Sequence, residues 1–431
     1  MNSEGSSALR RASLRVGLAV SLLIGPQLAA AAPPATVTAW MRSSNVYEGR
    51  SLLAAADRFN HLQSRYRVEM LPTELQDPEE YIHTAAATGS LPCLLEIDAP
   101  YLASFAWPEY LQSIDRFLTP ELRRDLLPSV LANGRYEGRQ YALGAFDAGL
   151  GLWGNRSHLR AAQVRLPTVQ RPWSLAEFEQ ALARLARVEG VAYPLDMAFF
   201  TPSPEFYAFA YLPLLQAFGG DVLAGGRGGA ASGVLDGPQS VAAMRRVQLW
   251  LRNGWTQPVF DRADDFESRR TALLWSGHWR YRDLRRALGD DLVLLPLPDF
   301  GRGIVTGTGS WSWVVSSTCS EPQGAWAFVA FLLSEAEIRR VTDDNGAVPA
   351  RRSMIEASAL YRNGGPLEVF AQQLSAGAGK PRPGTPGYKA ITAAFASAAR
   401  RIFEGADAQA ELSRAARSID NASARLAGRR P

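Results

Sequence analysis

The segment between residues 36 and 97 constrains the fold most strongly, because short β-prone runs alternate there with runs of helical spacing. The expected strands are Thr36–Trp40, Tyr66–Leu71 and Leu94–Ile97. Between them, apolar residues recur every three or four positions from Leu52 to Phe59, and Pro78–Thr88 forms a second helical pattern that Gly89 ends. This β-α-β-α-β order predicts an α/β fold in which helices cover both faces of a parallel sheet.

The chain has 431 residues, which is long enough for two domains, because single hydrophobic cores stop growing at roughly 250–300 residues. Its hydrophobic share of 47% indicates a well-packed globular protein rather than a disordered one. The formal net charge is only +4, and the basic residues are scattered along the chain. We therefore expect no nucleic-acid partner.

The N-terminus has the three parts of a secretory signal peptide. Arginines up to Arg15 precede an apolar run that ends at Leu28, and the small residues Ala29–Ala32 follow it. The run is too short and interrupted for a membrane span, which needs roughly 20 apolar residues. We expect residues 1–32 to be a cleaved leader and the mature chain to be periplasmic. An uncleaved anchor is the alternative, and the pair Arg10–Arg11 leaves twin-arginine export open beside the general route.

Turn and cap residues predict two further local structures. The pair Asn133–Gly134 beside Tyr136–Tyr141 predicts a β-hairpin with its turn at the Asn-Gly pair. Ser174–Val188 is expected to be a helix, because Ser174 and Glu177 can form a capping box and Gly190 ends the pattern.

Short motifs follow one another in a characteristic order over nearly the whole chain. They are Thr88–Asp98, Tyr136–Leu143, Asp147 with Leu152–Arg156, Gly277–Trp279, Gly307–Trp313, Gly346–Ser353 and Arg382–Tyr388. Each motif alone is common, but their order and spacing resemble those of the sugar-type extracellular solute-binding proteins, the maltose-binding-protein-like family 1. The sequence departs from the family pattern at Cys93, where an Asp is usual, and at Trp153–Gly154, where the crossing strand normally ends Tyr-Asn-Lys.

This resemblance implies two discontinuous α/β lobes joined by a hinge, the type II arrangement of periplasmic binding proteins. The first lobe would comprise residues 36–145 and 308–345, and the second lobe residues 146–307 and 346–431. A ligand would bind in the cleft between the lobes and close them by a hinge motion. The closed protein, a monomer, would then deliver its sugar to the permease subunits of an ABC-type importer in the inner membrane.

The resemblance also brings the two cysteines together. In the family topology, the strand that Cys93 opens lies antiparallel to the strand that Cys319 ends. It therefore implies a disulfide remote from the cleft, as an oxidising compartment allows. The alternative is two unrelated buried thiols, and a bridge requires Cα atoms within ~7 Å of each other.

A sugar presents hydroxyl groups around its rim and C–H groups on its faces, so its site needs aromatic surfaces with polar groups at their edges. Trp275, Trp279 and Trp311 stand among Gly and Ser residues that offer little apolar packing, and we expect them to contact the ligand. For each of them, interior packing is the alternative. Trp250 and Trp326 lie on apolar helix faces and are expected in the core.

The polar candidates come from strand ends and crossing segments. Asp98 follows a buried strand, where parallel sheets place their ligands, although it could also cap a helix. By the resemblance, Asp147 and Arg351 lie in crossing segments, where Arg351 would donate to adjacent hydroxyls or form a surface ion pair. The candidates that follow early strands are Trp40, Asn45, Gln76 and Tyr101.

An enzyme is the alternative from another class. The sequence contains neither a Gly-x-Ser-x-Gly elbow nor a His-Glu-x-x-His motif, and its four histidines lack metal-ligand spacing. We therefore expect no catalysis, no cofactor and no metal. Adjacent acids such as Asp264–Asp265 and Asp343–Asp344 leave a secreted glycoside hydrolase as the rival hypothesis.

Other ligands and roles stay open within the binding class. A polyamine site would need several acids around aromatic rings, and a phosphate site would need clustered arginines or helix N-termini. The expected cleft has two acids, one arginine and several tryptophans, which favours a neutral sugar. A polyamine, a polyol phosphate or an organic anion is the alternative ligand, and presenting the ligand to a sensor is the alternative role.

Overall fold

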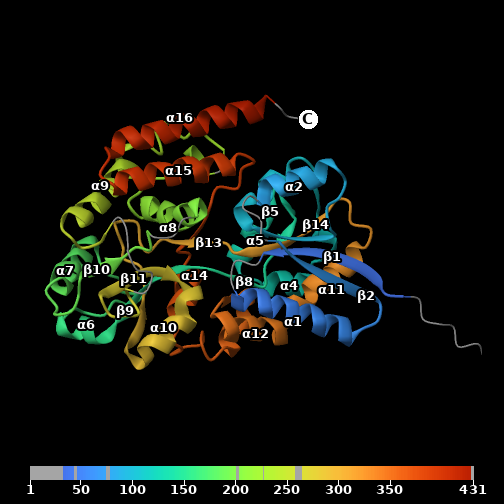
Figure 1. Cartoon of the computed structure of the whole chain (residues 1–431), viewed down its shortest axis with the longest axis horizontal. Coiled ribbons are helices and arrows are strands. Elements are labelled where there is room, and N and C mark those ends of the chain that lie inside the picture. Colours follow the sequence, from blue (N-terminus) through green and yellow to red (C-terminus); the bar gives the residue numbers. More distant parts are fainter. Residues whose placement is uncertain are drawn as a thin grey trace, which may run out of the picture.

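A computed structural model describes residues 33–42, 46–73, 78–199, 203–226, 228–257 and 265–428. It shows two α/β lobes side by side, with the chain passing between them several times (Figure 1). Lobe 1 is built on the sheet that begins with β1 (Ala35–Arg42), and lobe 2 on the sheet that contains β9 (Leu150–Asn155). The α/β class predicted from the sequence is confirmed.

The sheet of lobe 1 has the strand order β2-β1-β3-β14-β4, with β7 also paired to β14. Besides β1, its strands are β2 (Tyr66–Thr73), β3 (Leu94–Asp98), β4 (Leu111–Gln112), β7 (Ala142–Leu143) and β14 (Trp311–Ser316). β2 and β3 run parallel to β1, as the alternating pattern predicted. β14 returns from much later in the sequence and lies antiparallel to both β3 and β4.

Helices cover both faces of this sheet, because side chains alternate along each strand. Leu94 of β3 packs into a core shared with residues of α1 (Val46–Leu62) and α11 (Pro322–Leu332), and α12 (Glu335–Asn345) packs against both helices. Leu95 and Ile97 pack into the opposite core, against α2 (Pro78–Ala87) and α3 (Leu102–Ala106). β3 is therefore buried along its length, and only Asp98 at its carboxyl end is partly exposed.

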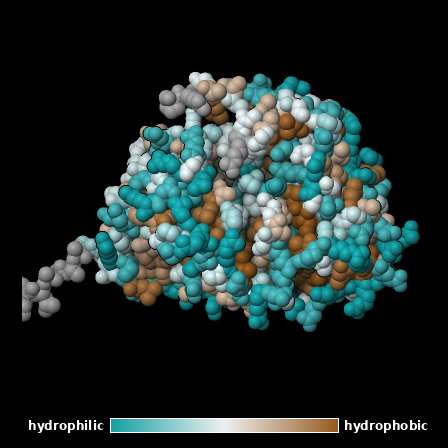
Figure 2. All heavy atoms as spheres, turned by 180° about the vertical axis from the view of Figure 1, so that it is seen from behind, coloured by the Kyte–Doolittle hydropathy of each residue, from teal (hydrophilic) through white to brown (hydrophobic). Residues whose placement is uncertain are grey.

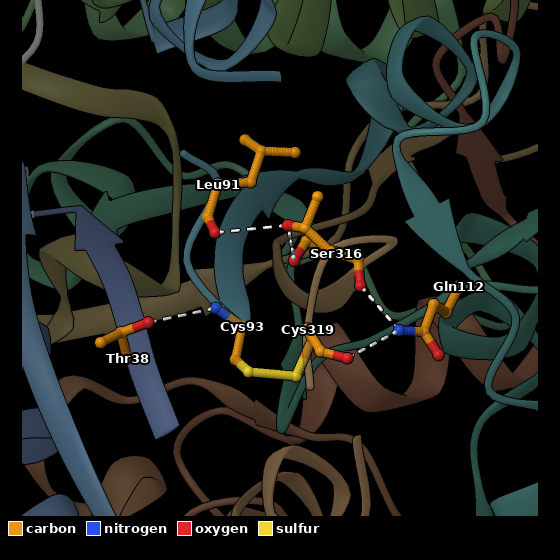
Figure 3. The surroundings of a disulfide bond; sticks show 7 residues. Thr38, Leu91, Cys93, Gln112, Ser316 and Cys319 are labelled. Carbon is orange, nitrogen blue, oxygen red and sulfur yellow. Dashed lines mark hydrogen bonds between the residues drawn. A yellow bond between two sulfur atoms is a disulfide. The ribbon is translucent and has the colours of Figure 1, made fainter. Parts of the chain in front are cut away.

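A disulfide joins β3 to the segment after β14 (Figure 3). The Cα atoms of Cys93 and Cys319 are 4.3 Å apart, so the predicted bridge is confirmed. The amide nitrogen of Ser316 donates to the carbonyl of Cys93, and Gln112 Nε2 donates to the carbonyl of Cys319. Hydrogen bonds and a covalent bond therefore fix the same end of the β3–β14 pair, opposite to Asp98.

The sheet of lobe 2 has the order β10-β11-β9-β12. Its other strands are β10 (Tyr193–Asp196), β11 (Thr271–Gly277) and β12 (Leu292–Leu295). Both β9 and β11 are buried throughout, which explains their nearly continuous apolar sequence. The helices of this lobe are α6 (Arg156–Ala161), α7 (Leu175–Leu185), α8 (Pro204–Ala217), α9 (Pro238–Arg252), α10 (Tyr281–Leu288), α15 (Tyr388–Phe403) and α16 (Ala408–Ala427).

Two small strand pairs lie between the lobes, at the centre of Figure 1. β8 (Phe146–Asp147) pairs with β15 (Val348–Pro349), and β13 (Thr306–Thr308) pairs with β16 (Gly379–Pro381). The helices α4 (Pro120–Asp125), α5 (Pro128–Asn133), α13 (Arg352–Ala357) and α14 (Glu368–Ser375) complete the chain around them. These segments form the hinge region.

One local prediction holds and one is wrong. Ser174 and Glu177 form the expected capping box at the start of α7. The hairpin turn lies at Glu137–Gly138, between the two-residue strands β5 (Arg135–Tyr136) and β6 (Arg139–Gln140), and not at Asn133–Gly134. Glu137 and Gly138 both have positive φ, as the two central residues of a type I′ hairpin turn require. Asn133 instead ends helix α5.

The expected leader, residues 1–32, lies outside the described residues. Within the described ranges, none of the helices combines the length and apolar character needed to cross a bilayer. Seen from behind, the surface is mostly hydrophilic, with apolar patches scattered over both lobes (Figure 2).

Candidate functional site

A cleft of about 770 Å³ lies between the two lobes. Lobe 1 lines it with residues of β1, α1, α2, β3 and β14, and lobe 2 with residues of α8, α10 and α15 and with the turn after β11. This volume falls within the range of small-molecule sites, roughly 300–1,000 Å³. The cleft lies beyond the carboxyl end of β3, where an open α/β sheet binds its ligands.

The edge of the cleft in lobe 1 is the free end of the β3–β14 pair. Asp98 and Trp311 are direct partners in this antiparallel ladder, and the amide of Ala99 donates to the carbonyl of Ser310 at 3.3 Å. Because cross-strand partners have Cβ atoms about 4.5–5.5 Å apart, a carboxylate and an indole project together into the cleft. The guanidinium of Arg42 lies over the indole of Trp311, 4.1 Å from the ring centroid.

Arg382 crosses the cleft and is bound by carboxylates of both lobes. Its Nη1 and Nη2 donate to the two oxygens of Asp98 at 2.8 and 2.7 Å, and Nη1 also donates to Glu205 at the start of α8. The Arg382 side chain is only 4% exposed, and it lies over the ring of Phe209. The planar fork of arginine is what allows this bidentate contact.

Two tyrosines complete this network around Glu205. The hydroxyl of Tyr388 donates to Glu205 Oε1, and the hydroxyl of Tyr101 donates to Oε2 at 3.3 Å. Burial raises the pKa of Glu205, although the charge of Arg382 opposes the shift. Burial and the neighbouring carboxylates also raise the pKa of Tyr101, so its hydroxyl stays protonated and can donate.

A second pair of carboxylates, Glu48 of α1 and Glu96 of β3, lies in the same cleft. Glu96 is 8% exposed and accepts a hydrogen bond from the backbone nitrogen of Arg42 at 2.9 Å. Burial raises the pKa of Glu96 to about 7, and burial together with the charge of Glu96 raises the pKa of Glu48. We call these two residues the acid pair.

In lobe 2, the turn after β11 presents an indole and an imidazole. A Cβ atom at position 277 would lie 2.1 Å from the ring of Trp279, so glycine there lets the indole fold back over the backbone. Trp279 packs on Phe209 with ring centroids 5.8 Å apart, and it is only partly buried. His278 is 3% exposed, and burial lowers its pKa to about 4, so it is neutral at neutral pH.

Further contacts join the lobes around the cleft. The hydroxyl of Tyr47 donates to Asp283 at 3.3 Å, and the ammonium of Lys389 lies 3.9 Å from a carboxylate oxygen of Glu79. Together with Arg382, these pairs hold the two walls of the cleft together from different sides.

Four of the residues predicted from the sequence line this cleft: Asp98, Tyr101, Trp279 and Trp311. Asn45 and Gln76 lie outside the described residues. The remaining four, Trp40, Asp147, Trp275 and Arg351, are placed elsewhere by the structure.

The two misplaced tryptophans are packing residues. Trp275 is 2% exposed and belongs to the core of lobe 2, because its side chain points to the covered face of β11. The small residues next to it reflect the turn that follows and not an open surface. Trp40 packs on Tyr81 of α2, with ring centroids 4.7 Å apart.

Asp147 and Arg351 bond to other segments of the chain and do not line the cleft. Asp147 is 1% exposed, and its Oδ1 accepts from the amides of Ala148 and Gly309 at 2.8 and 3.0 Å. It thereby ties one crossing segment to another. Arg351 donates to Asp125 at 2.6 Å and to the carbonyl of Leu333 at 3.1 Å, so the surface ion pair considered as its alternative is the one that forms.

Only some of the cleft residues that the prediction missed stand out in the sequence. Glu96 interrupts an otherwise apolar buried strand, which is unusual for a carboxylate without a role. Arg382 stands in a Pro- and Gly-rich loop within a motif already noted, but its partners Asp98 and Glu205 are far away in sequence. Glu48 and Glu205 stand in the first turns of helices, where acids are ordinary.

The described residues hold no group of three or more His, Cys, Asp or Glu side chains that could bind a metal ion.

Comparisons with known proteins match most of the chain. The family model described as bacterial extracellular solute-binding protein matches residues 54–364. An uncharacterized lipoprotein encoded in the oleD 5' region of Streptomyces antibioticus is 23% identical over 365 residues, which are 81% of this chain and 79% of that protein.

Two solved structures share the fold. The GacH receptor of Streptomyces glaucescens, solved unliganded and with acarbose, has a TM-score of 0.74 and 22% identity, covering 92% of this chain and 100% of that one. The sugar-binding protein MalE of Xanthomonas citri has a TM-score of 0.78 and 18% identity, covering 91% and 98%.

Proposed function

Because this chain belongs to the bacterial extracellular solute-binding protein family, we propose that it captures a sugar in the cleft between its lobes and delivers it to the permease of an ABC-type importer. The main support for a sugar ligand is that one cleft contains both partly exposed indoles and charged hydrogen-bonding groups. Apolar ring faces suit the C–H faces of a sugar, and carboxylates and guanidinium groups suit its hydroxyls. The structural relatives GacH and MalE, which are described with acarbose and as sugar-binding, support this assignment.

The proposed roles follow from position. Trp279 stacks on the sugar from lobe 2, and Trp311 contacts it from lobe 1 on the part of its ring that Arg42 leaves free. Asp98 and Glu205 accept from hydroxyl groups, since a carboxylate has about four acceptor positions and Arg382 occupies only some of them. Tyr101 belongs to the same polar rim. Asn45 and Gln76 remain candidates by their positions after the first two strands.

We further propose that the lobes move as rigid bodies, residues 36–145 and 308–345 against residues 146–307 and 346–431. Asp147 and the two strand pairs would form the hinge. The ion pairs of Arg382 and Lys389 and the Tyr47–Asp283 hydrogen bond would then form as the cleft closes.

The chain would act as an exported monomer in the periplasm, without catalytic activity. Its partner would be the permease, which would accept the closed form. Incubation with chromogenic glycosides should give no product, and turnover would show that the cleft is catalytic.

The direct test is a thermal-shift screen of the mature chain with mono-, di- and trisaccharides, followed by calorimetric titration. A ligand at 100 times its Kd should stabilise the protein by about 2.7 kcal/mol and raise the melting temperature measurably. If no carbohydrate raises it, while a phosphate ester or an organic anion does, the sugar assignment is wrong.

A further inference from the structure

The described lining of the cleft holds more acidic than basic side chains. Its carboxylates are Glu48, Glu79, Glu96, Asp98, Glu205 and Asp283, and its cations are Arg42, Arg382 and Lys389. Arg382 serves two carboxylates, Asp98 and Glu205, and Lys389 lies beside Glu79. The cations that line the cleft therefore cannot neutralise all six acids one to one.

Within the described residues, neither member of the acid pair forms an ion pair with a cation of the cleft. The backbone N–H of Arg42 donates a hydrogen bond to Glu96, but the guanidinium of Arg42 lies over the Trp311 ring. Glu48 Oε1 is buried and has no hydrogen-bond partner among the described residues. A buried carboxylate oxygen without a partner is unfavourable, so a donor that enters with the ligand would relieve it.

A separate observation points to a polar group on the ligand. His278 lines the cleft from lobe 2, is only 3% exposed, and is uncharged at neutral pH. Its Nδ1 is buried and lacks a hydrogen-bond partner within the described part of the chain. Opposite walls of the cleft thus each present a buried polar atom with an unmet hydrogen bond.

We propose that the sugar carries a protonated amine, and that the acid pair of lobe 1 binds it. This inference rests on the proposed sugar-binding function and specifies the ligand class as an amino sugar. Glu96 and Asp98 stand two positions apart and project from the same face of β3. An ammonium group at the acid pair would therefore place the neighbouring hydroxyls of the same ring toward Asp98 and Trp311.

The acid pair also makes binding depend on pH. The charged groups that face Glu96 are Arg42 from β1 and Glu48 from α1, whereas its partner on β14 is the uncharged Trp313. Because the pKa of Glu96 is raised to about 7, the free protein partly protonates it near neutral pH, and a bound ammonium favours its ionised form. Affinity for an amine should therefore rise with pH through the range where Glu96 titrates, by at most about tenfold per pH unit.

The test is calorimetric titration with matched sugars that differ in one group. One set is glucosamine, N-acetylglucosamine and glucose, another is the β-1,4-linked glucosamine dimer, its N-acetylated form and cellobiose, and a third is trehalosamine and trehalose. The amine of at least one set should bind about tenfold or more tightly than its hydroxyl and amide counterparts, because a charged hydrogen bond is gained. Its affinity should be higher at pH 7.5 than at pH 5.5.

Substitutions locate the effect. Glu96→Gln and Glu48→Gln should each reduce the affinity for the amine about tenfold more than the affinity for the hydroxyl counterpart. Glu69→Gln is the matched control, because Glu69 is an exposed carboxylate on β2 that does not line the cleft. If a variant fails to fold, the pH dependence of the wild-type chain still decides the question.

The outcomes separate this inference from the function on which it rests. Equal binding of a hydroxyl sugar and its amine overturns the amino-sugar inference and leaves sugar binding in place. Binding of spermidine without any sugar overturns both, and so does the absence of binding by every compound in the panel.

Discussion

Two regions, the cleft and the crossing segment before α13, each contain an arginine that binds an aspartate far away in the sequence. Arg351 donates to Asp125 and to the carbonyl of Leu333, and both partners belong to lobe 1. Arg382 donates to Asp98 in lobe 1 and to Glu205 in lobe 2, so it links the two lobes. The Arg351 side chain is 22% exposed, whereas that of Arg382 is 4% exposed.

An arginine–aspartate pair therefore has a different effect on the two lobes when its partners lie in one lobe than when they lie in both. Both partners of Arg351 lie in lobe 1, so its contacts fix the start of this crossing segment to that lobe. An arginine with partners in both lobes must lose at least one of them when the cleft opens. The second arrangement makes Arg382 part of the closed state, and burial makes its charge expensive to leave unpaired.

The largest expected effect is that of Arg382→Leu. Removing the guanidinium leaves Asp98 and Glu205 buried without their cation, and such a loss typically costs about 3–5 kcal/mol. Denaturant unfolding followed by circular dichroism measures it. Arg382→Lys keeps the charge but not the fork, and it should recover part of the stability. A loss below about 1 kcal/mol for Arg382→Leu would contradict the role given to this network.

Removal of the disulfide should separate stability from binding. The double variant Cys93→Ala with Cys319→Ala should lower the free energy of unfolding by about 2–4 kcal/mol, since the bridge closes a long loop. It lies at the end of β3 opposite to Asp98, so the Kd for the ligand should change less than about twofold in titrations below the melting range. A much larger change in Kd would mean that the two ends of β3 are coupled.

The tryptophans of the cleft should behave in the opposite way. Trp279→Ala and Trp311→Ala should each weaken ligand binding by about 1–3 kcal/mol, as loss of an aromatic contact residue does. Trp326→Ala is the control, because Trp326 stacks on Phe117 in lobe 1, with ring centroids 5.4 Å apart, and does not line the cleft. It should reduce the melting temperature and leave the Kd unchanged. Equal effects of all three variants on Kd would remove the distinction.

Arg351→Ala should have a smaller effect than Arg382→Leu. Its ion pair with Asp125 is partly exposed, so we expect a loss of about 1 kcal/mol in stability. The Kd should not change, because Arg351 lies away from the cleft lining. A loss of binding comparable to that of Arg382→Leu would mean that Arg351 reaches the ligand after all.

The smallest expected effects are those of pH, and they differ in sign between the two regions. Burial raises the pKa of Asp125, but hydrogen bonds from Ser353 and Arg351 outweigh it and hold this pKa below 3.8. The stability from Asp125 is therefore present above pH 3.8 and lost as the pH falls through the folded-state pKa.

Glu205 has the opposite shift, because burial raises its pKa above 4.5. Its contribution is present below pH 4.5 and is lost as the pH rises through the folded-state pKa. Unfolding curves of Asp125→Asn and Glu205→Gln against the wild type, from pH 3 to pH 8, should diverge at opposite ends of this range. Divergence at the same end would refute the distinction between the two carboxylates.

Local patterns were sufficient for the first strands and helices and for part of the site, whereas the two lobes and the disulfide followed from the family resemblance. The strands and helices before Asp98 follow from the spacing of apolar residues and from the glycines and prolines that end each element. The position of Asp98 follows from the rule that parallel sheets bind ligands at the carboxyl ends of their strands. Trp279 and Trp311 stood out through their Gly- and Ser-rich surroundings, but the same surroundings misled for Trp275. Its place in the core is set by which face of β11 it occupies, and that depends on neighbouring strands that the local sequence does not reveal.

Charged residues were harder to place, because their function depends on distant partners. Arg351 and Arg382 both stand in loop motifs of the C-terminal third, and nothing in either motif distinguishes a hinge anchor from a cleft residue. The distinction arises only when folding brings Glu205 near one of them and Leu333 near the other. The acid pair likewise exists only because the start of α1 and the carboxyl end of β3 meet at the cleft.

The position of β14 has a consequence for biogenesis. This strand completes the central pairing of lobe 1, yet it is synthesised after every strand of the lobe 2 sheet. As the chain emerges from a translocation channel, β3 can pair with β1 at once but must wait for β14 until the sheet of lobe 2 has passed through. The first lobe to begin folding is therefore among the last structures to finish, and its early strands remain available to chaperones and proteases during that interval.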